Sequence, residues 1–232
     1  MDTAQIPAPR LVSLAERDAK TLTLVGQRQI EWDPMTAMRL VVGRSAIASY
    51  VVLPMDVMCM VAVPAQVSPE AEGAAVTASL ASFIAGLREA LGDDESISFD
   101  IDSLPSVVAP VGQGLTLSQL PPSDGWQMPI HGVSSDVTPV VKAAVNEFRQ
   151  RTVGMGDRQA AQVAEEIWAR SAWAGLPMRT LHAARRLRLL TDEPLRITAS
   201  TNGPWKRLST PRGQLFTYSA GIEARLGLRV VR

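Results

Sequence analysis

The chain has 232 residues, with 23 Lys and Arg against 23 Asp and Glu, and 46% of its residues are hydrophobic. This balance is typical of a globular protein and leaves room for one large domain or two small ones. Cys59 is the only cysteine, which excludes an intramolecular disulfide and a zinc site built on two cysteines of one chain.

Targeting signals are not visible, and we expect a cytoplasmic protein. The segment from Met1 to Arg10 lacks the apolar core of a secretory signal. The longest apolar stretch, Tyr50 to Val63, is interrupted by Pro54 and Asp56 and is too short to span a bilayer. A lone cysteine also suits a reducing compartment.

The first part of the chain predicts a helix, an antiparallel meander, a second helix and a further strand. Turn residues separate the apolar runs of the meander, and leucines and isoleucines at steps of three and four mark the second helix. The predicted elements are a helix over 11–30, strands over 37–42, 46–53 and 57–63, a helix over 69–91, and a strand over 97–101.

Residues 103–136 are rich in Pro, Gly and Ser and predict a long loop or linker, with one strand over 115–117. Three helices follow, the second beginning at Asp157 and the third at Pro177, which suits a first helical turn. Asn202-Gly203 predicts a hairpin. The predicted C-terminal elements are helices over 137–151, 157–170 and 177–188 and strands over 195–200, 205–209, 214–219 and 226–230.

These elements predict an α+β protein of two domains. Residues 1–125 are expected to form an acidic α+β domain, in which an antiparallel sheet packs on a helix. Residues 126–232 are expected to form a basic domain of three helices followed by an antiparallel sheet, the order of a winged helix-turn-helix.

Two blocks of residues resemble an uncharacterised bacterial protein family with no assigned activity. The resemblance implies a two-block organisation and no particular chemistry. The residues that carry it are Asp33-Pro34, Ala37, Arg39 and Leu40 in the first block, and Leu176-Pro177, Arg179, Ala183–Leu187, Trp205, Arg207, Leu208, Pro211 and Gly213 in the second.

Charge is divided unequally along the chain. Residues 1–136 carry 7 Lys and Arg against 16 Asp and Glu, a formal charge of −9, whereas residues 137–232 carry 16 against 7, a formal charge of +9. The basic half is expected to meet either an external polyanion or the acidic half of the same or another chain.

The third helix concentrates the candidate binding residues. Arg179, His182, Arg185 and Arg186 share one side of it, and Leu181, Ala183, Ala184 and Leu187 share the other. In a winged helix this basic side would enter the major groove, while Trp205, Lys206 and Arg207 on the hairpin would contact phosphates or stack. The sequence therefore predicts a non-catalytic interaction or regulatory protein that binds nucleic acid through the four residues of this side and through Lys206 and Arg207.

Two alternatives stay open. In the first, the protein docks on itself or on a protein partner through its opposite charges, with no nucleic acid involved. In the second, Asp100 and Asp102 point to one side of a strand, beside the acidic run 93–95, and serve an enzyme or hold a hard cation. No motif for a nucleophile, a dinucleotide or a metal is present, so we predict no cofactor and no catalytic residue.

Overall fold

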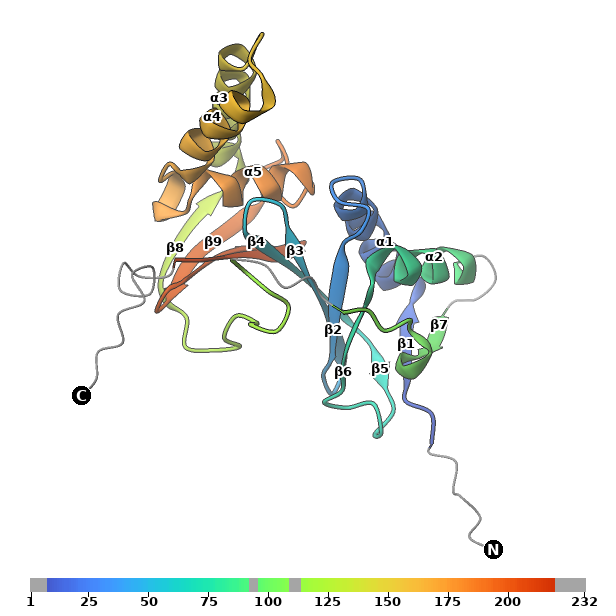
Figure 1. Cartoon of the computed structure of the whole chain (residues 1–232). Coiled ribbons are helices and arrows are strands. Elements are labelled where there is room, and N and C mark those ends of the chain that lie inside the picture. Colours follow the sequence, from blue (N-terminus) through green and yellow to red (C-terminus); the bar gives the residue numbers. More distant parts are fainter. Residues whose placement is uncertain (1–7, 92–95, 109–113, 220–232) are drawn as a thin grey trace, which may run out of the picture. The chain divides into compact units, whose positions relative to one another are not determined.

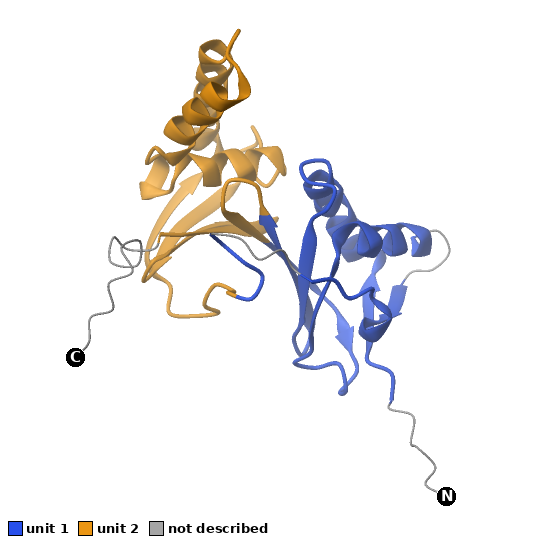
Figure 2. Ribbon diagram, viewed as in Figure 1, with its two compact units in different colours: residues 1–52, 60–118 blue, residues 53–59, 119–232 orange. Residues whose placement is uncertain are grey.

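The computed structural model describes residues 8–91, 96–108 and 114–219. The chain forms two compact units, residues 1–52 and 60–118 in unit 1 and residues 53–59 and 119–232 in unit 2 (Figure 2). Segment 53–59 thus belongs to unit 2, although the chain on both sides of it belongs to unit 1. The predicted α+β class is confirmed, while the predicted domain boundary between residues 125 and 126 stays a prediction.

Unit 1 is built from two antiparallel sheets and a pair of helices (Figure 1). The smaller sheet has the strand order β5-β1-β7, and the other has the order β6-β2-β3-β4. The elements are β1 (Leu11–Ala15), α1 (Glu16–Ile30), β2 (Ala37–Val42), β3 (Ala46–Leu53), β4 (Val57–Pro64), β5 (Gln66–Val67), β6 (Ala75–Ser79), α2 (Leu80–Ala90), β7 (Ser96–Asp100) and the 3-10 turn η1 (Ile101–Ser103).

Two helix predictions in this unit were too long. Residues 11–15 form β1, which pairs with β7 and buries Val12 and Leu14, so tertiary pairing decides the state of a short apolar run. Residues 75–79 form β6, which pairs with β2, and the helix begins only at Leu80. The meander strands β2, β3 and β4 are confirmed, and Cys59 in β4 is buried as predicted.

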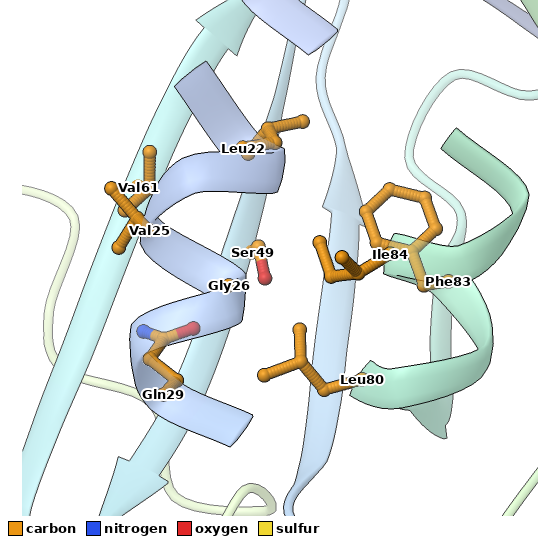
Figure 3. A pocket seen from close by; sticks show the side chains of 9 residues that line it. All are labelled: Leu22, Val25, Gly26, Gln29, Ser49, Val61, Leu80, Phe83 and Ile84. Atoms are coloured by element: carbon orange, nitrogen blue, oxygen red, sulfur yellow. The ribbon is translucent and has the colours of Figure 1, made fainter. Parts of the chain in front are cut away.

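The two helices of unit 1 approach closely at Gly26. A Cβ built on Gly26 would lie 2.4 Å from Ile84 Cδ1 and 2.7 Å from Ile84 Cγ1, so a side chain at this position of α1 would overlap the Ile84 side chain of α2. Figure 3 shows Gly26 facing Ile84, with Ser49 beside the contact. The remaining cavity has a volume of about 10 Å³, at most the space for one water molecule.

Unit 2 places one antiparallel sheet, of order β11-β10-β9-β8, against three helices. From residue 119 onward, unit 2 runs as unit 1 does from its first strand, with a strand, then helical structure and then antiparallel strands. Its elements are β8 (Gln127–Val133), α3 (Ser134–Arg151), α4 (Asp157–Ala169), the 3-10 turn η2 (Trp173–Gly175), α5 (Met178–Arg186), β9 (Arg196–Asn202), β10 (Trp205–Thr210) and β11 (Gly213–Tyr218).

The order of three helices and an antiparallel sheet is confirmed, but β8 was predicted as linker. Pro129, the positive φ of 51° at Met128 and a register shift between Gln127 and Ile130 interrupt this strand. It lies at the edge of the unit 2 sheet, where proline and bulges are tolerated. No strand forms over 115–117, and the strand predicted over 226–230 lies outside the described residues.

None of the helices in the described ranges has both the length and the apolar character needed to cross a membrane.

Candidate docking surface

Arg179, at the start of α5, is held within unit 2. Its Nη1 donates to the carbonyl oxygen of Met55 at 3.3 Å, and its Nη2 lies 3.5 Å from Glu165 Oε1. Its side chain is 22% exposed, whereas that of Glu165 is 73% exposed. The acceptor comes from segment 53–59, so the first half of the chain helps to fix α5.

His182 is half-buried and stacks on Trp168 of α4, with ring centroids 4.3 Å apart and planes inclined by 25°. Burial, together with the nearby charge of Arg186, lowers the pKa of His182 to about 4, from an ordinary value of 6.5. The imidazole is therefore neutral at pH 7 and adds no positive charge to the predicted basic side of α5.

Arg185 and Arg186 differ in their surroundings. Arg185 is 29% exposed, and its Nη1 lies 3.1 Å from Asp192 Oδ1, an oxygen that Lys142 Nζ approaches to the same distance. Arg186 is exposed. Of the α5 residues that were predicted to contact an anion, Arg179 and Arg185 thus already form contacts inside unit 2.

Lys206 and Arg207 point to opposite faces of the unit 2 sheet, as neighbours on a strand must. Lys206 Nζ donates to the carbonyl oxygen of Gly175 at 2.6 Å, on the side of the sheet where the helices lie. We call the opposite side the outer face. The structure does not bring Lys206 and Arg207 together into one binding group.

Arg207 lies on the outer face and stacks on an indole. Its Cζ is 4.3 Å from the ring centroid of Trp126, and its Nε donates to Ser200 Oγ at 3.0 Å. Partial burial lowers the pKa of Arg207, because desolvation disfavours the charged form. Within the described residues, no carboxylate forms an ion pair with Arg207.

Aromatic residues surround Arg207 and make up the rest of the site. Trp126 packs on Phe216 at 5.7 Å, and Trp205 meets Tyr218 edge-on at 5.1 Å. The strand register explains this grouping, since Arg207 pairs with Phe216 and Trp205 pairs with Tyr218 across β10 and β11. We call the group of Trp126, Trp205, Arg207, Phe216 and Tyr218 the outer-face cluster.

The segment before β8 holds Trp126 over the sheet. The indole Nε1 of Trp126 donates to the carbonyl oxygen of Pro122 at 3.0 Å, and Asn202 Nδ2 donates to that of Asp124 at 2.8 Å. Of this cluster, the sequence pointed to Arg207 as a binding residue and to Trp205 as its neighbour on the hairpin, which would contact phosphates or stack. Period-two alternation in the two C-terminal strands could have found Phe216 and Tyr218, but nothing in the sequence placed Trp126 beside them.

Asp100 and Asp102 are engaged locally. Asp102 forms a bidentate ion pair with Arg10, and Asp100 Oδ1 accepts from the backbone N–H of Asp102 at 3.0 Å. The Arg10 guanidinium lowers the pKa of Asp102. In the part of the chain that the structure describes, no three His, Cys, Asp or Glu side chains gather as metal ligands do; the acidic run 93–95 lies outside it.

Comparisons with known proteins give a family match and a fold. Residues 121–221, less than half of the chain, match a family described as "Domain of unknown function (DUF8185)". That description assigns no activity, in agreement with the resemblance to an uncharacterised family. No curated protein matches the chain.

Solved structures similar to this chain include sliding clamps and beta subunits of DNA polymerase III. The Pseudomonas aeruginosa DNA polymerase sliding clamp has a TM-score of 0.55 and 12% identity over 95% of this chain and 68% of that one. The Caulobacter crescentus pol III beta has a TM-score of 0.57 and 12% identity, over 94% of this chain and 68% of that one. The Thermotoga maritima DNA polymerase III beta subunit has a TM-score of 0.54 and 10% identity, over 93% of this chain and 67% of that one.

At this identity the comparison shows the fold alone: the chain has a fold similar to that of sliding clamps. The winged-helix interpretation of the C-terminal part is not supported, because the helices and strands that suggested it lie within a region that matches clamp structures.

Proposed function

We propose that this protein is a non-catalytic docking protein that binds a protein partner through a clamp-like fold. The observation that carries the proposal is the agreement of more than nine tenths of the chain with sliding clamps and polymerase beta subunits. Their names associate them with a DNA polymerase, so a DNA-associated protein is the first class of partner to test.

The state of the basic residues also favours a protein partner over nucleic acid. A nucleic-acid surface needs several cations free to neutralise phosphates. Here Arg179 and Arg185 contact carboxylates of unit 2, Lys206 contacts a backbone carbonyl, and His182 is neutral at pH 7. The arrangement favours docking, the alternative that the charge division already suggested.

Site-specific photo-crosslinking tests the proposal with the whole chain. Tyr218 is 36% exposed on the outer face, and replacing it with benzoylphenylalanine keeps an aromatic ring there. We expect a light-dependent adduct in the protein's own cells that resists nuclease and yields peptides of a second protein. The same group at Glu89, exposed on α2, controls for random collisions. A nuclease-sensitive adduct, or none, contradicts the proposal.

A DNA titration is the second test of the proposed function. Replacing Arg185 and Arg186 with Ala removes two cations from the predicted basic side of α5. If nucleic acid were the ligand, the log-log salt dependence would flatten by about one unit for each lost phosphate contact. We expect the whole chain to bind DNA weakly and the double variant to bind it equally weakly.

A further inference from the structure

The charge on Arg207 has an unusual setting among the half-buried cations of unit 2. Arg179 and Arg185 each lie beside a carboxylate, and Lys206 donates to a carbonyl oxygen. Arg207 is half-buried too, yet its hydrogen bond goes to the hydroxyl of Ser200, and no carboxylate of the described residues pairs with it. Partly buried charges are normally paired, because burial without a counter-charge is costly.

Within the described residues, the outer end of the Arg207 guanidinium has no hydrogen-bond or ion-pair partner. Its Nε is used by Ser200 Oγ, and one of its flat faces lies over Trp126. The two Nη groups remain, and together they form the fork that binds both oxygens of a carboxylate. Trp126 is itself fixed by Phe216 and by the carbonyl of Pro122, so the fork is positioned before any ligand arrives.

We propose that Arg207 and Trp126 form the position on the outer face that receives a carboxylate side chain of the protein partner. The inference rests on the proposed docking function and specifies the chemistry of its partner. An apolar side chain next to that carboxylate would pack on Tyr218, whose exposed ring stands edge-on to Trp205. The partner segment thus carries an acidic residue beside an apolar one.

A nucleic-acid phosphate fits this position less well. The cross-strand neighbours of Arg207, Ser200 and Phe216, carry no charge. Asp124 is exposed two residues before Trp126, so the segment that holds Trp126 carries a negative charge and no positive one. One cation among uncharged and acidic neighbours suits a single carboxylate and not a row of phosphates.

The test follows two side-chain signals by NMR, the indole N–H of Trp126 and the Nε–H of Arg207, in the whole chain. The probe is an acetylated, amidated leucine–glutamate dipeptide, and its glutamine counterpart is the matched control. We expect saturable shifts of both signals with the glutamate probe at up to about 10 mM, and affinity at least ~tenfold weaker for the glutamine probe. Equal responses to both probes, or none, would overturn the inference.

Variants of Arg207 show whether binding needs the two-nitrogen fork of the guanidinium or only its positive charge. Arg207→Gln should abolish the shift of the Trp126 signal, and Arg207→Lys, which keeps the charge and loses the fork, should weaken binding several-fold. Arg158→Gln, an exposed position on α4, should change nothing. If Arg207→Gln does not fold, the lysine variant and the titration of the unaltered chain still decide. A short DNA duplex that shifts both signals at lower concentration than the dipeptide would assign the site to nucleic acid.

Failure of this inference is distinguishable from failure of the docking function. If the nuclease-resistant adduct at Tyr218 persists in the Arg207→Gln variant, docking stands and the carboxylate position is wrong. If the dipeptide binds at Arg207 while no protein adduct forms, the position stands and the docking function is wrong.

Discussion

The imidazole of His182 lies against the indole of Trp168, and this stack joins α5 to α4. Phe148 of α3 packs on the same indole at 5.8 Å, so three helices meet at Trp168. A proton on His182 would place a charge in this half-buried stack beside Arg186, which is why its pKa falls to about 4.

This pKa predicts a pH dependence of stability. Between pH 6.5 and 4 the unfolded chain binds a proton at His182 that the folded chain does not, so the free energy of unfolding decreases as the pH falls through this window. The contribution of His182 is complete above pH 6.5. We expect His182→Gln to flatten this part of the stability profile in denaturant melts at pH 7.5, 5.5 and 4.5. The same slope in His182→Gln and in the unaltered protein would contradict the low pKa of this imidazole.

Gly26 and Gly86 provide a matched pair of helix substitutions. Gly26→Ala should destabilise unit 1 by about 1–3 kcal/mol, because the new methyl group overlaps Ile84. Gly86→Ala, in the middle of α2 with nothing within 4 Å of the new Cβ, should stabilise by roughly 0.5–1 kcal/mol. Thermal or denaturant melts measure both. If the two substitutions had the same sign, the close contact of α1 with α2 would be wrong.

Glu166 should titrate far below an ordinary glutamate. Arg151 and Arg170 donate to its two oxygens at 2.6 and 2.8 Å and lower its pKa to about 2, from an ordinary value of 4.5. A lowered carboxylate pKa adds stability above pH 4.5, and this is lost as the pH falls toward 2. Carboxyl-carbon NMR should show the low value, and Arg151→Gln should raise it. A midpoint near 4.5 in the unaltered protein would mean that the ion pairs do not form in solution.

Cys59 should react slowly with thiol reagents. It is buried in β4 between Met58 and the half-buried Met60, so a reagent reaches it only when the strand opens. We expect labelling of the native protein to be far slower than labelling in denaturant, and to accelerate with added urea below the unfolding midpoint. Native labelling as fast as that of the denatured chain would contradict the burial of β4.

The meander could be predicted because local signals agree there. Turns at Gly43 and Pro54 separate three apolar runs of six to eight residues, and this spacing leaves one consistent strand register. The structure has strands over nearly the same residues. Residues 75–79 could not be predicted in this way. Their small side chains are compatible with a helix, and only pairing with β2 makes them a strand.

The site was harder to predict than the fold. Placing Arg179, His182 and Arg185 on one side of a helix follows from periodicity, but their partners come from segments 53–59, 157–169 and 187–195. Whether a basic side is free depends on such distant partners, which periodicity does not report. The stack of Arg207 on Trp126 depends in the same way on a segment that looked like linker.

Segment 53–59 affects how the chain can be divided into fragments. The carbonyl oxygen of Met55 accepts a hydrogen bond from Arg179, which lies more than a hundred residues later in the chain. Met55 belongs to the half of the chain that carries most of the acidic residues. A fragment that starts after residue 118 would contain every described helix of unit 2 and still lack part of that unit. On a ribosome, unit 2 is begun before unit 1 is finished and completed only after it, so no single cut in the chain yields both units whole.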